Sequence, residues 1–161
     1  MQLLKIPPSR GLYVLIGYLA NNTTLVVGKL GRLNFKQGFY LYIGSAKGPG
    51  GLRARIKRHL SRRKKLKWHI DYLTIANHFK PIAILYTTAT NITENLIVEL
   101  LINNGFQVAI EGFGSTDDRK SKTHLLYAQG EYRERDIIIK RVFKALKSLD
   151  KVYLRILNLT S

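Results

Sequence analysis

The chain has 161 residues, of which 45% are hydrophobic, contains no cysteine and carries a formal net charge of +17. Its length and apolar content are enough for one domain with its own core, and the lack of cysteine excludes disulfides and thiolate metal sites. No segment is long and apolar enough to cross a membrane, and the start of the chain has neither the basic stretch nor the cleavage site of a signal peptide, so we expect a cytoplasmic protein.

Three apolar segments near the start of the chain predict β-strands. Residues 12–19 are a continuous run of apolar, β-branched and aromatic side chains, which is typical of a buried strand. A turn at Asn21-Asn22 separates it from a second strand at residues 24–29. A third strand at residues 38–44 ends at the glycine-rich bend of residues 48–51, where the backbone can approach a ligand closely.

A helix is predicted to follow this bend. Leu52, Ile56 and Leu60 recur every four residues and form one apolar stripe. Arg55 and His59 are also four residues apart, so they share a helix face beside the stripe. The helix therefore presents a guanidinium and an imidazole just beyond the third strand.

The positive charge of the chain is concentrated in this region. No Asp or Glu precedes Asp71, and nine of the fifteen residues from Arg53 to Lys67 are basic. Like charges at this density repel one another unless a polyanion neutralises them, which favours nucleic acid as the partner. A solvated face is the alternative, and an anionic membrane surface is disfavoured because the run lacks an exposed aromatic face. The predicted DNA contacts are Lys47, Arg53, Arg58, Arg62, Arg63, Lys64, Lys65 and Lys67.

The later part of the chain predicts two further helices and a strand. Residues 95–104 form an apolar helix, residues 135–149 have apolar side chains at helical spacing, and residues 152–157 predict an edge strand. We assign residues 1–130 to one domain and residues 131–161 to a C-terminal helical extension packed on it. The predicted fold is α/β (α+β), with a small mixed or antiparallel sheet flanked by helices.

Several motifs carry chemically active side chains in a fixed order. Gly11-Leu12-Tyr13 and Tyr42-Ile43-Gly44 are followed by Arg55, by His59 and by a carboxylate on a later helix. This ordered set resembles the GIY-YIG nuclease superfamily, and the resemblance covers roughly residues 9–127. It implies a metal-dependent endonuclease.

Further segments resemble an uncharacterised branch of this superfamily, some members of which are joined to a base-excision glycosylase of the endonuclease III kind. The resemblance implies such a glycosylase as a partner. The chain departs from better-known members because it has Ser45 where repair enzymes often carry Lys, and no Asn at the usual late position. The matching segments are Gly50-Gly51-Leu52, Trp68-His69-Ile70-Asp71-Tyr72-Leu73, Gly112-Phe113-Gly114-Ser115 and Thr123-His124-Leu125.

Tyr13, Tyr42, Arg55 and His59 are the predicted catalytic residues. We expect the two tyrosines on neighbouring strands of one sheet, with Arg55 and His59 on the helix that follows. A tyrosine with a pKa near ~10 is a poor base at neutral pH, but adjacent cations favour the phenolate. The planar fork of Arg55 suits phosphate oxygens, and we expect His59 to orient water, protonate a leaving group or bind phosphate. Taken singly, each tyrosine is also compatible with a core position and the arginine with a surface one.

The resemblance also implies one acidic residue that holds a single Mg²⁺ or Mn²⁺ ion. Glu94 is the predicted ligand, with Glu99 as the alternative. Glu94 also completes a possible capping box, Asn91-Ile92-Thr93-Glu94, in which its side chain would bond the first amide of the helix. A single carboxylate suits Mg²⁺, which keeps most of its waters and takes further ligands from phosphate.

Two other motifs receive structural interpretations. His69 and Asp71 are two residues apart and diverge on a helix, which favours a hydrogen-bonded His beside a buried Trp68, with support of the site as the alternative. Residues 112–117 predict a mobile glycine-rich loop that contacts substrate, although its acids disfavour a phosphate cradle.

These observations predict a metal-dependent DNA endonuclease that hydrolyses phosphodiester bonds in DNA repair or in the processing of structured DNA, and that is associated with DNA in the cytoplasm. The alternative is a nucleic-acid-binding module of the same fold that has lost catalysis. An RNA-processing nuclease or RNA binder is the third interpretation, since a basic surface does not distinguish the two polymers.

Overall fold

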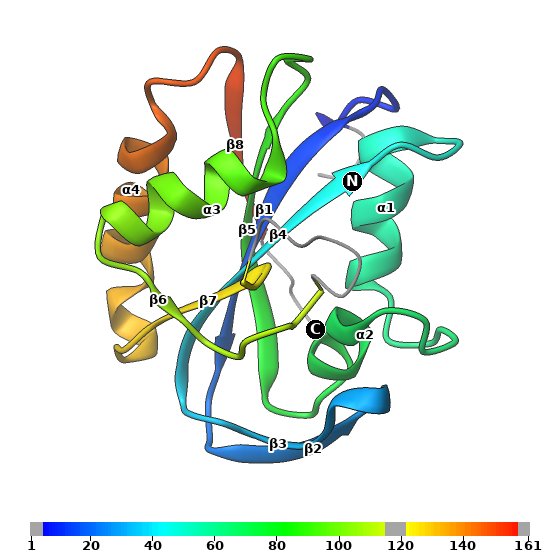
Figure 1. Ribbon diagram of the computed structural model, residues 1–161, viewed down its shortest axis with the longest axis vertical. Helices are drawn as coiled ribbons and strands as arrows, with labels where there is room; N and C mark the ends of the chain where they lie inside the picture. The colour runs from blue at the N-terminus through cyan, green and yellow to red at the C-terminus, as the bar shows by residue number, and fades with distance from the viewer. Residues whose placement is uncertain (1–4, 115–121, 158–161) are drawn as a thin grey trace.

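The computed structural model in Figure 1 describes residues 5–114 and 122–157 of the chain. Its centre is a six-stranded sheet in the order β6-β7-β4-β1-β5-β8, in which all neighbours are antiparallel. The predicted α+β fold with an antiparallel sheet is confirmed. The strands are β1 (Gly11–Leu19), β4 (Gly38–Ala46), β5 (Phe79–Thr87), β6 (Gln107–Val108), β7 (Leu125–Ala128) and β8 (Val152–Ile156).

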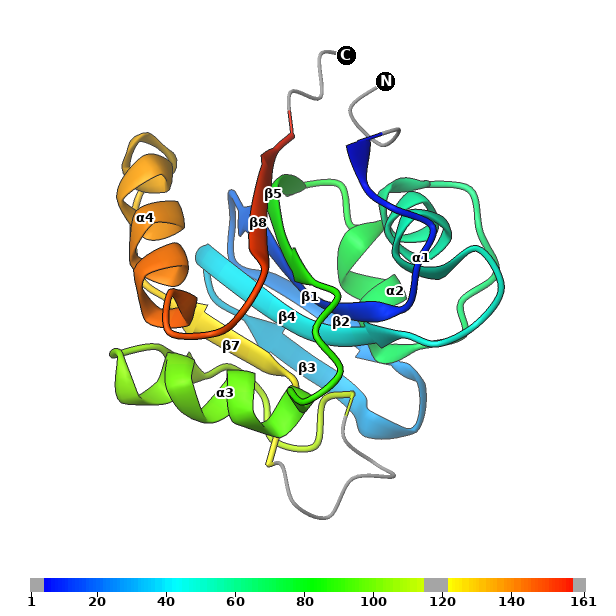
Figure 2. The ribbon, with the colours of Figure 1, turned by 90° about the horizontal axis from the view of Figure 1, so that it is seen from above.

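Helices cover both faces of the sheet (Figure 2). One face packs against α3 (Glu94–Asn103) and α4 (Arg135–Leu146), and the other against α1 (Gly51–Leu60) and α2 (His69–Thr74). Eight of the nine residues of β1 are buried. Side chains of a strand alternate between its two faces, and both faces are covered here, which explains why β1 is a continuous apolar run in the sequence.

A two-stranded sheet lies beside α2, at the bottom of Figure 1. It consists of β2 (Thr23–Val27) and β3 (Gly31–Phe35), joined by the 3-10 turn η2 (Gly28–Leu30). The predicted second strand therefore ends at Val27, because the turn begins at the next residue. Val27 and Phe35 face the core cluster under α2, so this hairpin covers one end of the core.

The N-terminal segment fixes the start of α1. The amides of Leu52 and Arg53 donate to the carbonyl oxygens of Ser9 and Pro7, at 2.9 and 3.1 Å. A Cβ atom on Gly51 would lie 2.2 Å from the Ser9 oxygen, so glycine is required for this approach. The sequence predicted that a ligand could approach the backbone at this glycine-rich bend. In the structure the group that approaches it is the backbone of the N-terminal segment.

The helix α4 and the strand β8 complete the fold. Helix α4 packs on α3 and β5, and β8 pairs with β5 at the edge of the sheet, with Leu85 opposite Leu154. The predicted edge strand at residues 152–157 is confirmed and ends at Ile156. Over the ranges described above, no helix has the length and apolar character needed to cross a membrane.

Candidate active site

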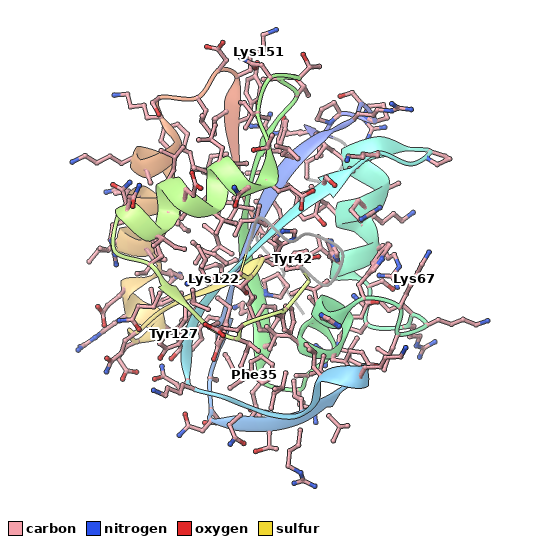
Figure 3. The ribbon with its side chains drawn as sticks, viewed as in Figure 1. Phe35, Tyr42, Lys67, Lys122, Tyr127 and Lys151 are labelled. Carbon is pink, nitrogen blue, oxygen red and sulfur yellow. The ribbon has the colours of Figure 1, made fainter. Side chains whose placement is uncertain are left out.

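Tyr13 and Tyr42 lie on adjacent strands and project from the same face of the sheet. In the antiparallel register of β1 and β4, Tyr13 is opposite Gly44 and Tyr42 is opposite Leu15. Their ring centroids are 6.3 Å apart, and Tyr42 lies near the middle of the molecule in Figure 3. A Cβ atom on Gly44 would lie 2.4 Å from the Tyr13 hydroxyl oxygen, so glycine makes room for this hydroxyl. The predicted neighbouring placement of the two tyrosines is confirmed.

His59, on α1, is buried against both tyrosine rings. Its side chain is 1% exposed, and its Nε2 atom lies 2.5 Å from the Tyr13 hydroxyl oxygen. Burial, with a further effect from the Lys64 ammonium, lowers the pKa of His59 to about 3. In a neutral imidazole one ring nitrogen carries no hydrogen and accepts hydrogen bonds, so Nε2 can accept a hydrogen bond from the Tyr13 hydroxyl. The other nitrogen, Nδ1, has no hydrogen-bond partner among the residues that the structure describes.

Burial raises the pKa of both tyrosines, and the predicted lowering by adjacent cations is therefore wrong. For Tyr13, removal from water is the largest effect, Tyr42 adds to it, and Arg55 opposes it. For Tyr42, removal from water and then the charge of Glu94 raise the pKa, and Arg55 again opposes them. The arginine is close to both hydroxyls, as expected, but the loss of water outweighs its charge.

Glu94 is the first residue of α3, and the charge of its carboxylate acts on the pKa of both tyrosines. The helix is capped by Thr93, whose Oγ1 accepts a hydrogen bond from the Leu96 amide at 3.1 Å. The predicted capping box is therefore wrong, because the helix begins three residues after Asn91. Glu94 is left with a contact of 3.3 Å between its Oε2 atom and Nδ1 of His124. The alternative ligand, Glu99, is exposed on α3 and accepts a bond from Asn95 at 3.4 Å.

His124 is a site residue for which sequence analysis predicted no role. It is 6% exposed and immediately precedes β7, where the amide of Ile43 donates to its carbonyl oxygen at 2.9 Å. This bond extends the pairing of β4 and β7 and brings His124 from a distant part of the chain to Glu94. Sequence analysis identified the motif Thr123-His124-Leu125. It could not predict the contact of His124 with Glu94, because that contact depends on strand pairing, which spacing in the sequence does not specify.

The predicted substrate loop at residues 112–117 lies partly within the described residues. The amide of Gly114 donates to Nδ1 of His69 at 2.9 Å, which confirms the predicted hydrogen-bonded histidine. A Cβ atom on Gly114 would lie 3.2 Å from both the Tyr42 ring and the His124 side chain. This part of the loop therefore packs against the site, and residues 115–121 lie outside the described residues.

The family model described as domain of unknown function DUF123 matches residues 12–148. The chain belongs to this family. The match runs from β1 to just beyond α4 and includes every site residue discussed above. Comparisons with curated proteins and with solved structures give no match to this chain.

Part of the basic segment of this DUF123 chain is neutralised internally. Arg58 donates from Nη1 and Nη2 to the two carboxylate oxygens of Asp71, at 2.6 and 2.8 Å. The Lys64 ammonium lies 3.8 Å from the same carboxylate, and the side chains of Lys64 and Asp71 are 5% and 0% exposed. Arg58 and Lys64 therefore stabilise the fold, which corrects the expectation that the whole basic segment awaits a polyanion.

Two further basic residues of the segment bond to the backbone. Arg53 donates from Nε to the Ile6 carbonyl oxygen at 2.8 Å, and Arg62 donates from Nη2 to that of Ile75 at 3.0 Å. Figure 3 shows Lys67 on the outer side of the molecule, beyond α1 and α2. The exposed members of the predicted DNA contacts are Lys47, Arg62, Arg63, Lys65 and Lys67.

Glu94 is the carboxylate that a divalent cation at this site would use. The Glu94 side chain is 23% exposed, so its carboxylate is accessible to solvent. The described residues contain no group of three or more His, Asp or Glu side chains arranged to hold a metal. A Mg²⁺ or Mn²⁺ ion bound here would take one carboxylate from the DUF123 chain and its other ligands from water and phosphate.

Proposed function

We propose that this DUF123 chain is a nuclease of the GIY-YIG type that hydrolyses phosphodiester bonds of DNA with one Mg²⁺ or Mn²⁺ ion. The convergence of Tyr13, Tyr42, Arg55, His59 and Glu94 carries the proposal. Tyr13, Tyr42 and His59 are in contact, and the charges of Arg55 from α1 and Glu94 from α3 act on both tyrosines, although these residues are far apart in sequence. Hydrolysis of a phosphodiester needs a proton acceptor, a cation for the developing charge and a metal ligand, and this set supplies all three.

The contacts suggest a division of roles between the tyrosines. Tyr13 is bonded to neutral His59, which holds its hydroxyl in place. Glu94 is the strongest charge acting on the pKa of Tyr42, whereas for Tyr13 it comes after Tyr42 and Arg55. We therefore assign the Tyr42 hydroxyl to accept a proton from the attacking water. Glu94 would hold the cation, which would supply Lewis acidity and offset the carboxylate charge that disfavours the Tyr42 phenolate. Arg55 stabilises the charge that builds on the phosphate oxygens.

A binding module without catalysis is the second candidate. The observation that favours it is the burial of Tyr13, together with the raised pKa of both tyrosines, which opposes a role as base. Strand scission separates the two candidates, because a module binds DNA without cutting it. A protein that cuts RNA and leaves DNA intact would support the RNA-processing alternative.

The biological setting follows the same resemblance. We propose a role in DNA repair or in the processing of structured DNA, in the cytoplasm and in association with DNA, with a base-excision glycosylase as a partner. The exposed basic side chains after α1 support the DNA contact, since they lie on the same helix-and-loop segment that supplies Arg55 and His59.

DNA binding is expected to weaken steeply as salt rises, mainly through the exposed basic residues after α1. Replacing Arg63, Lys65 and Lys67 together by Ala should reduce the slope of log affinity against log salt by up to about 0.9 for each lost phosphate contact. The matched control replaces Lys140, Lys144 and Lys147, three exposed lysines on and next to α4 across the sheet.

Fluorescence anisotropy with labelled branched DNA at several salt concentrations measures both slopes. Equal slopes in the two triple variants would show that the segment after α1 is only a solubilising surface. Lys64 is left intact in both, because its ammonium donates to the carbonyl oxygens of Arg58 and His59 at the end of α1.

A further inference from the structure

Trp68 is the centre of a stack of cationic side chains beside the site. It immediately precedes α2, and the guanidinium carbons of Arg55 and Arg58 each lie 4.2 Å from its ring centroid. The Lys67 ammonium lies 5.1 Å from the same centroid, and the ring of His59 is 6.4 Å away. A guanidinium over an indole ring is attracted by the electrons of its face.

The Asp71 carboxylate holds Trp68 and Arg58 in position. It is fully buried, and besides its two bonds from Arg58 it accepts the amides of Lys67 and Trp68 at 2.8 and 2.9 Å. One carboxylate therefore fixes both the backbone of Trp68 and the Arg58 side chain that lies on its ring. Arg58 also donates to the Lys65 carbonyl oxygen at 2.8 Å, so its donors are used within the fold.

Arg55 differs from Arg58 in what holds it. Its guanidinium lies against the Trp68 ring and beside the Tyr13 hydroxyl, and within the described residues it forms no ion pair with an acidic side chain. An aromatic ring orients a guanidinium without cancelling its charge, whereas a carboxylate would cancel it. Arg55 is therefore held in a defined position with its full positive charge available to an anion.

We propose that Trp68 is a positioning residue that places Arg55 at the tyrosine pair, with Arg58 and Asp71 as its support. The inference rests on the proposed function for its catalytic consequence, because a prepositioned guanidinium lowers the barrier only if a phosphate reacts there. The contact itself is independent of catalysis. Trp68 is the only tryptophan in the chain, so its fluorescence reports on the contact directly.

The first test measures acrylamide quenching of Trp68 in the full chain without DNA or metal. Arg55→Ala uncovers part of the ring and should raise the quenching constant above that of the wild type. Lys57→Ala, an exposed change on the same helix, is the control and should leave it unchanged. Equal quenching constants in wild type and Arg55→Ala would overturn the proposal, whether or not the protein cuts DNA.

The second test is a double-mutant cycle on single-turnover DNA cleavage. Trp68→Leu should lower the rate by roughly 3- to 30-fold at saturating DNA, with little change in DNA affinity, and Trp68→Phe should restore most of the loss. In the Arg55→Ala background Trp68→Leu should have no further effect, because the residue to be positioned is absent. If the rate of the double variant falls by the product of the two single losses, Trp68 acts independently of Arg55, and the proposal would be overturned.

The two tests also separate this inference from the proposed function. If the protein never cuts DNA but its Trp68 quenching depends on Arg55, the contact between Arg55 and Trp68 is supported and the proposed nuclease function is not. If the protein cuts DNA but the losses of Trp68→Leu and Arg55→Ala multiply in the double variant, the nuclease function is supported and the positioning role of Trp68 is not.

Discussion

Glu94→Gln is expected to abolish metal-dependent strand scission while the protein still binds DNA. The substitution keeps the size of the side chain but removes the charge that would hold the cation. It also removes a negative charge near the bound phosphate, so DNA affinity without metal should persist or rise. Because Thr93 and not Glu94 caps α3, the free energy of unfolding should fall by less than about 1 kcal/mol, the size of a helix-dipole effect.

Glu99→Gln is the matched control for this prediction. It makes the same chemical change five residues later on α3, at an exposed position where the carboxylate accepts a weak hydrogen bond from the Asn95 side chain. Cleavage of a branched DNA in Mg²⁺ and complex formation in EDTA are measured for both variants. Normal cleavage by Glu94→Gln would remove this residue from the metal site, and loss of cleavage in Glu99→Gln alone would transfer the role to Glu99.

Asp71→Asn is expected to lower the free energy of unfolding by about 3–5 kcal/mol. The carboxylate is fully buried, and the substitution leaves Arg58 without its ionic partner and Lys64 without a nearby negative charge. It also weakens the bonds that hold the amides of Lys67 and Trp68. Urea denaturation measures the change, with Asp150→Asn at an exposed position as the control, for which we expect a shift within about 0.5 kcal/mol.

The same carboxylate gives a defined pH dependence of stability. Burial alone would raise the pKa of Asp71, but the bonds from Arg58 and from the amides of Trp68 and Lys67 outweigh it and lower the pKa from 3.8 to about 2. The folded state therefore binds this proton less readily than the unfolded state, and the stabilisation is present above pH 3.8 and lost as the pH falls through 2.

His59 titrates in a different window, because its pKa is lowered from 6.5 to about 3, so its contribution declines between these values as the pH falls. The difference in stability between wild type and Asp71→Asn isolates the Asp71 contribution. This difference should be constant from pH 7 to about 4 and shrink below that. A difference that does not change down to pH 2 would contradict the assignment of the stabilisation to the ionised carboxylate.

The sequence predicted the parts of the site that local patterns determine. The continuous apolar run of β1, the third strand and the helix stripe after it predicted the elements. The resemblance of the ordered motifs then placed Tyr13 beside Tyr42, with Arg55 and His59 on the next helix. These positions follow from periodicity within short segments and from the order of the motifs.

The start of α3 was not predictable in the same way. Asn91 and Thr93 are both residue types that cap helices, and a Glu stands three residues after Asn91. In the structure Thr93 accepts the Leu96 amide, which moves Glu94 from the third helical position to the first. The Glu94 side chain is therefore not used in a capping box and is available to the site.

Contacts between distant segments were the main features that the sequence missed. Asp71 lies beyond the basic segment, and only the folding of the segment back over α2 brings Arg58 and Lys64 to it. The tyrosine pKa values were wrong in direction for a related reason, since the sequence reveals nearby cations but not how far a hydroxyl is removed from water.

We expect one phosphodiester to contact the whole site, and strand scission under single-turnover conditions tests this most directly. The site consists of Tyr13, Tyr42, Arg55, His59 and Glu94. Purified wild-type protein in excess is mixed with end-labelled nicked, looped or branched DNA in Mg²⁺ or Mn²⁺, with EDTA as the control. We expect cleavage that stops in EDTA and slows on the order of 10²-fold or more in Arg55→Ala, with a smaller loss of affinity. Tight binding of all these DNAs without cleavage in either metal would contradict this expectation and identify the chain as a binding module.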